Sequence, residues 1–345
     1  MTRIVSTTTG LYPLPDTAKE ELSDLKGNQK EDLIGPDLDD ETEAVYDRVR
    51  AELIETQADA GLDQVVEGQA RWDDMLAHPF AVHEAVETRG IVRYYDNNNF
   101  YREPVVTDEL TADGDVAAEL EDAASHVDDG LQAVLPGPYS LADLGTDEYY
   151  GDPAEYLAAV AEFLAGEAGA FPDVETLLLL DPSLVENPPR AGYDAGEGED
   201  VFSDGIEGEA VTDAIDTLAG AVDAEVAVYP YWGALDEKTH AHVLDADVDA
   251  LGYDLVSEPD DNVYNVQEYG TTDDVALGLV DGQNTLVESP ETVRERVDWF
   301  TGSTPSEEYG TIYAVPNTEL FYLPENKFEA KLETLANAAH LEVTA

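Results

Sequence analysis

Cysteine is absent from this chain of 345 residues. A protein without cysteine forms no disulfide, has no thiolate nucleophile and binds no metal through sulfur. Long apolar runs are also missing, since the densest one, the four leucines at 177–180, is much shorter than a membrane span. Residues 1–10 lack the apolar segment of a secretory signal peptide. We therefore expect a cytoplasmic protein with no membrane partner.

Basic residues are scarce as well: 16 Lys and Arg stand against 78 Asp and Glu, which gives a formal net charge of −62. Because phosphate backbones are bound by clustered lysine and arginine, this composition argues against a nucleic-acid partner. Hydrophobic residues make up 43%, which is enough for a full core. The acidic residues are spread along the chain, and such charge destabilises a compact state unless salt screens it. The composition predicts a folded, acidic protein of an extreme halophile.

Strand and helix patterns alternate along the sequence. Helical patterns occupy 17–25, 41–60, 78–88, 117–127, 153–170, 210–222, 237–246, 291–300 and 327–340, and strand patterns occupy 3–9, 63–67, 131–136, 174–181, 225–231, 251–257, 275–281 and 311–316. Such alternation predicts parallel strands joined by helical crossovers. Eight strand units in this length favour an α/β fold of the (β/α)8 TIM-barrel type, forming one domain over 1–345. An open doubly wound sheet is the alternative, although no Gly-x-Gly-x-x-Gly follows a strand pattern.

One segment, 90–104, interrupts this alternation between the second and third strand units. A β-pattern at 91–95 runs into a polar turn at 96–99, and a second short strand follows at 100–102. The segment predicts an inserted hairpin. A plain surface hairpin is one interpretation, because loops collect polar turn residues. A clamp over the barrel mouth is the other, because arginine grips carboxylates and asparagine offers both donors and acceptors.

Seven short segments stand at or near the predicted strand ends, where a barrel builds its site. They are Thr7-Thr8-Thr9-Gly10-Leu11-Tyr12-Pro13, Gly68-Gln69 with Asp74-Met75, Tyr94-Tyr95-Asp96-Asn97-Asn98-Asn99-Phe100-Tyr101, Leu135-Pro136-Gly137-Pro138-Tyr139-Ser140, Tyr231-Trp232-Gly233, Gly278-Leu279-Val280-Asp281-Gly282-Gln283-Asn284 and Leu320-Phe321-Tyr322-Leu323-Pro324. In this order they resemble motifs of the cobalamin-independent methionine synthase family, and most of all the N-terminal of its two barrels. The uroporphyrinogen decarboxylase branch fits less well, because its arginine-rich opening motif is absent.

The resemblance implies a methyltransferase of methionine biosynthesis, which moves a methyl group from a 5-methyltetrahydrofolate to homocysteine. The family activates homocysteine on zinc, held by a His-x-Cys pair, an acid and a late Cys in the C-terminal barrel. Tyr229, Tyr231, Asp254 and Thr318 stand at these positions here, so we expect no zinc in this chain alone. The resemblance thus implies a folate-side component with folate as co-substrate and a separate zinc-bearing barrel chain as partner. A non-catalytic barrel that binds folate or a methyl donor is the alternative.

The strand ends and the resemblance together supply candidate ligand-binding residues, with no catalytic residue assigned. Gln69 stands where the family has the glutamate that holds the amino acid's ammonium, and three lysines after the first strand are candidates to hold a polyglutamate tail. The simple alternatives are turn-forming acids, core aromatics and solvated helix faces. The substrate-binding candidates are Arg93, Tyr95, Asp96, Asn97, Asn99, Gln69, Asp181, Tyr231, Trp232, Asp254, Asp281 and Asn284, and the polyglutamate-binding candidates are Lys19, Lys26 and Lys30.

Overall fold

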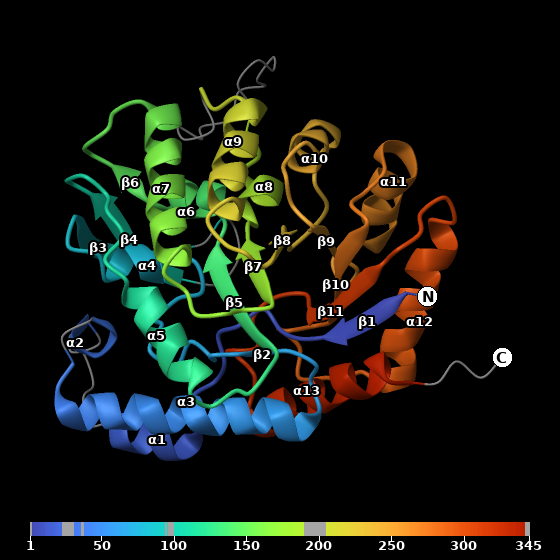
Figure 1. Cartoon of the computed structure of the whole chain (residues 1–345), viewed down its shortest axis with the longest axis horizontal. Coiled ribbons are helices and arrows are strands. Elements are labelled where there is room, and N and C mark those ends of the chain that lie inside the picture. The colour runs from blue at the N-terminus through green and yellow to red at the C-terminus, as the bar shows by residue number, and fades with distance from the viewer. Residues whose placement is uncertain are drawn as a thin grey trace.

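The computed structural model describes residues 2–22, 31–35, 38–93, 95, 100–189 and 205–341. Its central feature is a curled sheet of eight parallel strands with helices packed around it (Figure 1). The strand order is β1-β11-β10-β9-β8-β7-β5-β2. These strands are β1 (Arg3–Ser6), β2 (Val65–Val66), β5 (Leu131–Pro136), β7 (Thr176–Leu180), β8 (Glu225–Tyr229), β9 (Ala250–Asp254), β10 (Asp274–Val280) and β11 (Thr311–Pro316). The predicted TIM-barrel fold is confirmed.

The strand ladder runs from β1 round to β2, and contacts beside these two strands bring the edges together. The Ser6 carbonyl accepts hydrogen bonds from the N–H groups of Asp63 and Gln64, each at 3.1 Å, and the Gly68 carbonyl accepts one from Tyr12 at 3.2 Å. Because β2 has only two residues, these bonds take the place of a regular ladder on that side. The loops after β1 and β2 are therefore held against each other.

Helices α3, α7, α10 and α12 begin at a residue whose side chain caps the first turn. Asp39 accepts from the N–H groups of Glu41 and Thr42 at the start of α3, and Gly61 ends that helix in the left-handed region with φ 86°. The helices are α1 (Asp16–Leu22), α2 (Glu31–Ile34), α3 (Asp40–Ala60), α4 (His78–Ala81), α5 (Asp115–Ala124), α6 (Pro138–Leu144), α7 (Pro153–Ala168), α8 (Ser183–Glu186), α9 (Gly208–Ala219), α10 (Glu237–Leu244), α11 (Pro259–Tyr269), α12 (Pro290–Ser303) and α13 (Glu325–Ala339).

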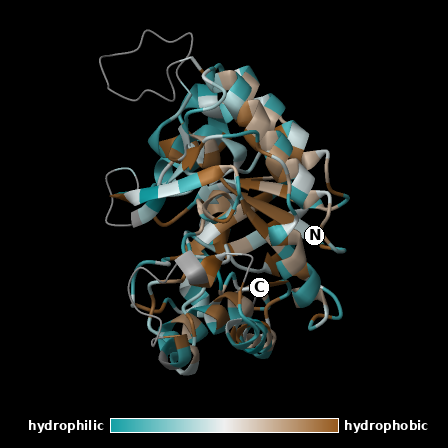
Figure 2. Cartoon of the chain, turned by 90° about the vertical axis from the view of Figure 1, so that its left-hand side faces the viewer, coloured by the Kyte–Doolittle hydropathy of each residue, from teal (hydrophilic) through white to brown (hydrophobic). Residues whose placement is uncertain are grey.

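The barrel strands form the core. All five residues of β7 are buried, four of them leucine, because a parallel strand is covered by side chains on one face and by helices on the other. Figure 2 shows the strands as the most hydrophobic part of the interior, with the outer helix faces hydrophilic. Among the described residues, no helix combines the length and the apolar character needed to cross a bilayer.

The predicted hairpin is present between β2 and β5. Its strands, β3 (Val86–Arg93) and β4 (Phe100–Val106), pair antiparallel, and β4 also pairs with the short strand β6 (Thr146–Asp147). The pair projects from the body of the molecule (Figure 2). The helix predicted over 78–88 is wrong beyond α4, because the residues from Val86 onward pair with β4. The sequence analysis also missed α6 and α11, and most of the loop predicted at 191–205 lies outside the described residues.

Candidate functional site

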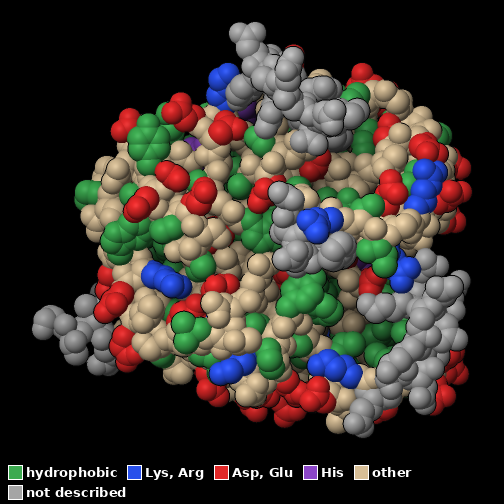
Figure 3. Space-filling model, turned by 180° about the vertical axis from the view of Figure 1, so that it is seen from behind, with side chains coloured by type: hydrophobic (Ala, Val, Ile, Leu, Met, Phe, Trp, Pro, Cys, Tyr) green, Lys and Arg blue, Asp and Glu red, His purple; other side chains and the backbone are tan. Residues whose placement is uncertain are grey.

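The loops that follow the barrel strands gather on one side of the molecule, toward which the hairpin projects. Figure 3 shows the face opposite to that of Figure 1, on which many side chains are acidic and few are basic. Backbone strain is concentrated in the same loops. Among the described residues, the non-glycine residues with positive φ are Leu11 (45°), Gln69 (51°), Tyr95 (37°) and Trp232 (71°). Such conformations cost energy and persist only where the surrounding structure enforces them, often at functional sites.

Asp254, at the end of β9, is a completely buried carboxylate with both oxygens engaged. Its Oδ1 accepts hydrogen bonds from the N–H groups of Val256 and Ser257, both at 2.9 Å. Its Oδ2 accepts from the Ser257 hydroxyl at 2.6 Å, from the Trp232 N–H at 3.1 Å and from Asn317 Nδ2 at 3.4 Å. This one side chain therefore braces the loops after β8, β9 and β11, which leaves little capacity for a ligand.

Asp181, at the end of β7, is equally buried but only half satisfied. Its Oδ1 accepts from the Ser140 N–H at 2.8 Å and from the Ser140 hydroxyl at 2.5 Å, whereas its Oδ2 has no hydrogen-bond partner. Burial raises the pKa of this carboxyl to about 7, although the bonds from Ser140 lower it. Gly137 leaves room for the group, because a Cβ there would lie 2.1 Å from Oδ2. A carboxyl of this kind is a candidate for ligand binding or proton transfer.

Tyr95 of the hairpin reaches this carboxyl through two serines. Its hydroxyl lies 2.5 Å from Ser183 Oγ, and the Ser183 N–H donates to Ser140 Oγ at 2.9 Å. Its ring meets Trp232 edge to face, with the ring centroids 5.7 Å apart. Burial raises the pKa of the phenol well above its usual range, so it stays protonated. Tyr95 of the hairpin thus reaches the strand ends beside Asp181, as the clamp interpretation expects, and a role of the hairpin in ligand binding stays a prediction.

Tyr229, which the resemblance sets at the place of the family's zinc-binding histidine, fills the barrel interior. Its hydroxyl donates to the Pro316 carbonyl at 3.3 Å, so the side chain reaches from β8 to the end of β11. Two glycines on the intervening strands make this possible. A Cβ on Gly252 would lie 2.1 Å from the ring, and one on Gly278 would lie 2.2 Å from the hydroxyl.

Tyr231 occupies the next expected ligand position and is also buried. Its hydroxyl donates to Met75 Sδ at 3.3 Å, and its ring meets Trp232 edge to face at 4.8 Å. Thr318, at the late-cysteine position, donates its hydroxyl to Glu319. With Asp254 saturated, these side chains do not supply the set of nitrogen and sulfur ligands that zinc takes. Within the described ranges, no group of three or more His, Asp or Glu is arranged to hold a metal.

Glu319 is a candidate that the sequence analysis missed. It follows β11, is 2% exposed, and accepts a hydrogen bond from the Thr318 hydroxyl. Burial raises the pKa of its carboxyl to about 7, and the nearby Asp74 carboxylate raises it further. Its position directly after a strand end was the available signal, because the loops after the strands build the site of a barrel.

Both polar atoms of the Gln69 side chain make hydrogen bonds inside the protein. Its Oε1 accepts from the Leu11 N–H at 2.8 Å, its Nε2 donates to the Val134 carbonyl at 3.3 Å, and its own N–H donates to Glu67 Oε2 at 2.5 Å. Gly10 has to be glycine here, because its φ is 75° and a Cβ would lie 2.4 Å from Gln69 Oε1. The predicted substrate-binding residue therefore ties the loop after β1 to β2 and β5.

The remaining predicted residues lie at the rim or outside the described ranges. Asp281 is half-buried and accepts from the Gln283 N–H at 3.0 Å, while Asn284 is exposed. Arg93 ends β3 with an exposed side chain, and Lys19 pairs with Asp16 at 3.1 Å on the exposed face of α1. The predictions for Asp96, Asn97, Asn99, Lys26 and Lys30 concern residues outside the described ones.

A parallel α/β barrel with buried polar groups at its strand ends defines the class of this protein. The model of the family described as "Cobalamin-independent synthase, Catalytic domain" matches residues 4–340. The chain belongs to the cobalamin-independent methionine synthase family. A methionine synthase of Saccharolobus solfataricus is 24% identical over 304 residues, which are 84% of this chain and 80% of the relative. One of Thermoplasma volcanium is 22% identical, over 82% of this chain and 73% of the relative.

Solved structures share the fold along the whole chain. A B12-independent methionine synthase from Shewanella sp. W3-18-1, in complex with selenomethionine, aligns with a TM-score of 0.72 and 16% identity over 97% of this chain and 96% of that one. A putative vitamin-B12-independent methionine synthase from Listeria monocytogenes aligns with a TM-score of 0.68 and 16% identity over 98% of each chain. The match to a catalytic-domain model leaves the predicted likeness to the N-terminal barrel untested.

Proposed function

We propose that this chain is the folate-side component of a methionine-synthase-type methyltransferase, which binds a 5-methyltetrahydrofolate at the barrel mouth and acts with a separate zinc-bearing barrel chain. The observation that carries the proposal is that the polar residues at the strand ends fall into two groups. The positions of the metal ligands are filled by packed tyrosines and a saturated aspartate, whereas Asp181 keeps one buried oxygen without a partner.

The chemistry of the Asp181 side suits a pterin. A pterin ring carries adjacent N–H donors and two aromatic faces. A carboxylate accepts from such donors, and aromatic rings in edge or offset contact hold such faces. Tyr95 and Trp232 stand next to each other within reach of the Asp181 network. Arg93 and the candidate lysines are suited to the glutamate carboxylates of the ligand, since Arg and Lys are the natural partners of such groups.

The reaction itself moves a methyl group from nitrogen to sulfur. The N5–CH3 bond of the folate breaks, the S–CH3 bond forms, and N5 takes up a proton. Burial raises the pKa values of Asp181 and Glu319 to about 7 each, so both are able to hold a proton near neutral pH. Gln69 has no free amide atom and no charge for an ammonium group. We therefore assign homocysteine activation to the partner chain.

The second candidate is a non-catalytic barrel that binds folate or a methyl donor. The observation that favours it is the same loss of metal ligands, since a barrel without an activated thiolate can still bind a ligand. A single-barrel relative from Shewanella is described in complex with selenomethionine, so methionine and homocysteine belong among the ligands to be tested. Activity in the presence of a zinc-bearing partner separates the two candidates.

The test uses purified chain in molar KCl and a zinc-bearing family member from the same source. Methyl transfer from 5-methyltetrahydropteroyl triglutamate to homocysteine is measured with each chain alone and with both. We expect activity that depends on both chains, and titration calorimetry should detect the folate bound to the present chain. Arg93→Ala with Asn97→Ala should weaken this binding about tenfold at an unchanged melting temperature. Arg294→Ala, which removes an equal charge on α12, is the matched control. Absence of folate binding would refute the proposal.

A further inference from the structure

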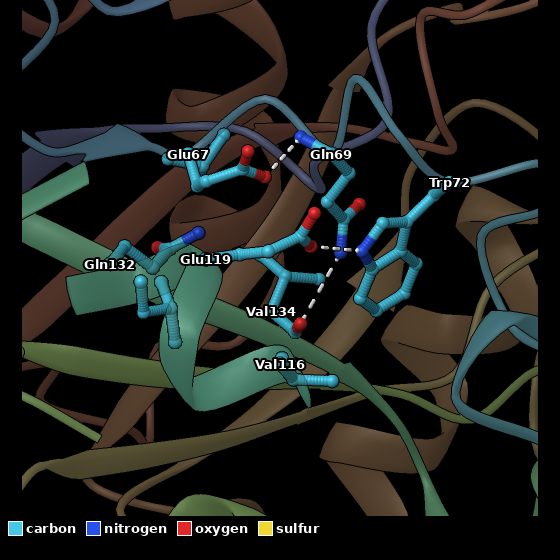
Figure 4. A pocket seen from close by; sticks show the side chains of 9 residues that line it. Glu67, Gln69, Trp72, Val116, Glu119, Gln132 and Val134 are labelled. Atoms are coloured by element: carbon cyan, nitrogen blue, oxygen red, sulfur yellow. Dashed lines mark hydrogen bonds between the residues drawn. The ribbon is translucent and has the colours of Figure 1, made fainter. Parts of the chain in front are cut away.

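Next to the barrel wall, a small internal cavity of about 10 Å³ lies between β2, β5 and α5. Figure 4 shows two glutamates, Glu67 and Glu119, and two glutamines, Gln69 and Gln132, converging on it, with Trp72 closing one side. A cavity of this size holds about one water molecule. It is too small for a substrate, so these groups do not line a substrate site. Their role is to hold neighbouring parts of the protein in place.

The two glutamates belong to a buried network of charges. Arg50 of α3 donates from Nε to Glu67 Oε1 at 3.0 Å. Glu119 of α5 accepts from Arg71 Nε at 2.6 Å and from Trp72 Nε1 at 2.8 Å. All five side chains are 7% exposed or less. Removing such charges from water is costly, and the cost is recovered only when the hydrogen-bonding geometry is good, so each group in this network is tightly constrained.

Glu67 connects this network to the barrel mouth. Its Oε2 accepts the Gln69 N–H at 2.5 Å, and this bond fixes the turn in which Gly68 and Gln69 both have positive φ, 99° and 51°. Gln69 in turn holds Leu11 and Val134 through its amide. The position of this one carboxylate oxygen therefore determines how the loop after β1, the loop after β2 and the end of β5 are arranged.

We propose that Glu67 is a positioning residue for the barrel mouth: by accepting the Gln69 N–H it sets the arrangement of these strand ends, and it does so more firmly when ionised. The inference rests on the proposed function in one respect only, namely that the ligand binds at the barrel mouth. A charged acceptor makes a shorter and stronger hydrogen bond than a neutral one. The ionised form therefore holds the Gly68–Gln69 turn more rigidly than the protonated form.

The surroundings of Glu67 bring its titration into the neutral range. Burial raises the pKa of its carboxyl to about 7 and Glu119 raises it further, whereas Arg50 and the Gln69 N–H lower it. The other charged or titratable groups that face this network include Asp47 and Tyr46 on α3, Asp115 and Asp122 on α5, Arg71 after β2, His78 on α4 and Tyr12 after β1. Two arginines and several acids thus share the site, and protonation of Glu67 relieves the excess of negative charge.

The first test needs no ligand. In full-length protein labelled with 15N-glutamine in molar KCl, the Gln69 amide proton should shift downfield between pH 6 and pH 8, as its hydrogen bond strengthens. Glu67→Gln keeps an acceptor that cannot ionise, and should abolish this titration. The matched control is Glu167→Gln. Glu167 is another buried glutamate that accepts backbone N–H groups, from Asp113 and Gly114, but it caps α5 from α7.

The second test measures binding of 5-methyltetrahydropteroyl triglutamate. Wild type and Glu167→Gln should bind more tightly at pH 8 than at pH 6, by about tenfold, while Glu67→Gln should show a flat profile. If the Gln69 resonance titrates but no folate binds, the positioning role stands and the proposed function fails. A Gln69 resonance that does not move with pH in the wild type, or that still titrates in Glu67→Gln, would overturn the inference. The wild-type measurement decides even if Glu67→Gln does not fold.

Discussion

Two aspartates at the ends of barrel strands β7 and β9 differ in the number of hydrogen bonds that their carboxylate oxygens accept. Asp254, after β9, accepts five hydrogen bonds and joins three loops. Asp181, after β7, accepts two bonds on one oxygen and none on the other. Both are completely buried. The residue type and the place in the fold are the same, so the two carboxylates differ in the number of donors aimed at them: Asp254 braces three loops, whereas Asp181 keeps one oxygen without a hydrogen-bond partner.

The same division extends to the neighbours of each aspartate. Tyr229 and Tyr231 beside Asp254 are packed into the barrel with their hydroxyls bonded. Beside Asp181, the serines lead to Tyr95 on an inserted hairpin. The side chains beside Asp254 are therefore packed in the barrel interior with their hydrogen bonds made. The side chains beside Asp181 form a polar chain that can respond to a ligand or a proton.

The comparison is tested most severely by the same isosteric change at both positions. Asp254→Asn places an amide N–H₂ among groups that are themselves donors, so we expect the free energy of unfolding to fall by about 3 kcal/mol or more, as is usual when buried partners are left unsatisfied. Asp181→Asn keeps the acceptor for Ser140 and should cost less than about 1 kcal/mol at pH 8. Urea unfolding in molar KCl measures both, and equal losses would erase the distinction.

The pH dependence of stability is the next largest effect. A carboxyl whose pKa is raised by folding stabilises the protein fully below its unfolded value, and this contribution is lost as pH rises through the folded value. Burial raises the pKa of Asp181 to about 7, so it should contribute a few kcal/mol that disappears between about pH 4 and pH 7. Asp181→Asn should flatten the slope measured by urea unfolding. An unchanged slope would mean that Asp181 is already ionised at acid pH.

A smaller effect is expected for the hairpin contact. Tyr95→Phe removes the hydroxyl that bonds to Ser183 but keeps the ring against Trp232. One such hydrogen bond contributes about 1 kcal/mol, so thermal unfolding should shift by only a few degrees. Folate affinity should fall about fivefold if the contact positions the hairpin for the ligand. Tyr149→Phe, on an exposed ring outside this network, is the control. Unchanged affinity would limit Tyr95 to a structural role.

No effect at all is expected from zinc. Because Tyr229, Tyr231 and Thr318 offer no nitrogen or thiolate ligand, addition of zinc to the isolated chain should leave its melting temperature unchanged, and elemental analysis should find no stoichiometric metal. About one zinc per chain would contradict the division between the two aspartates, since the Asp254 side would then be a metal site after all.

The sequence was sufficient for the features that depend on local patterns. β5 and β11 lie where the apolar runs predicted them, and the polar turn with its flanking β-patterns predicted the hairpin. The amphipathic pattern at 78–88 was misleading because pairing with β4 outweighs local helical preference for the residues after α4. Long-range pairing of this kind is not visible in a short window of sequence.

The site was predictable in outline only. Three of the five hydrogen bonds to Asp254 come from Val256 and Ser257, two and three residues further along the chain, and belong to a local turn. The other two donors to Asp254 are Trp232 and Asn317, the latter 63 positions away, and both bonds to Asp181 come from Ser140, so these contacts are not visible in the local sequence. Glu319 was not predictable in this way, because its burial and its bond from the Thr318 hydroxyl depend on how the loop after β11 folds. Side-chain contacts between distant segments determine these roles.

Tyr229 also has a consequence for how this barrel can evolve. The phenol fits only because Gly252 and Gly278 lack side chains, so the three positions form an epistatic set. A side chain at Gly252 would collide with the ring of Tyr229, and one at Gly278 would collide with its hydroxyl. Shortening Tyr229 alone would leave a ring-sized void, at a cost of about 3–5 kcal/mol. A substitution at any one of the three positions is therefore expected to need a compensating change at another.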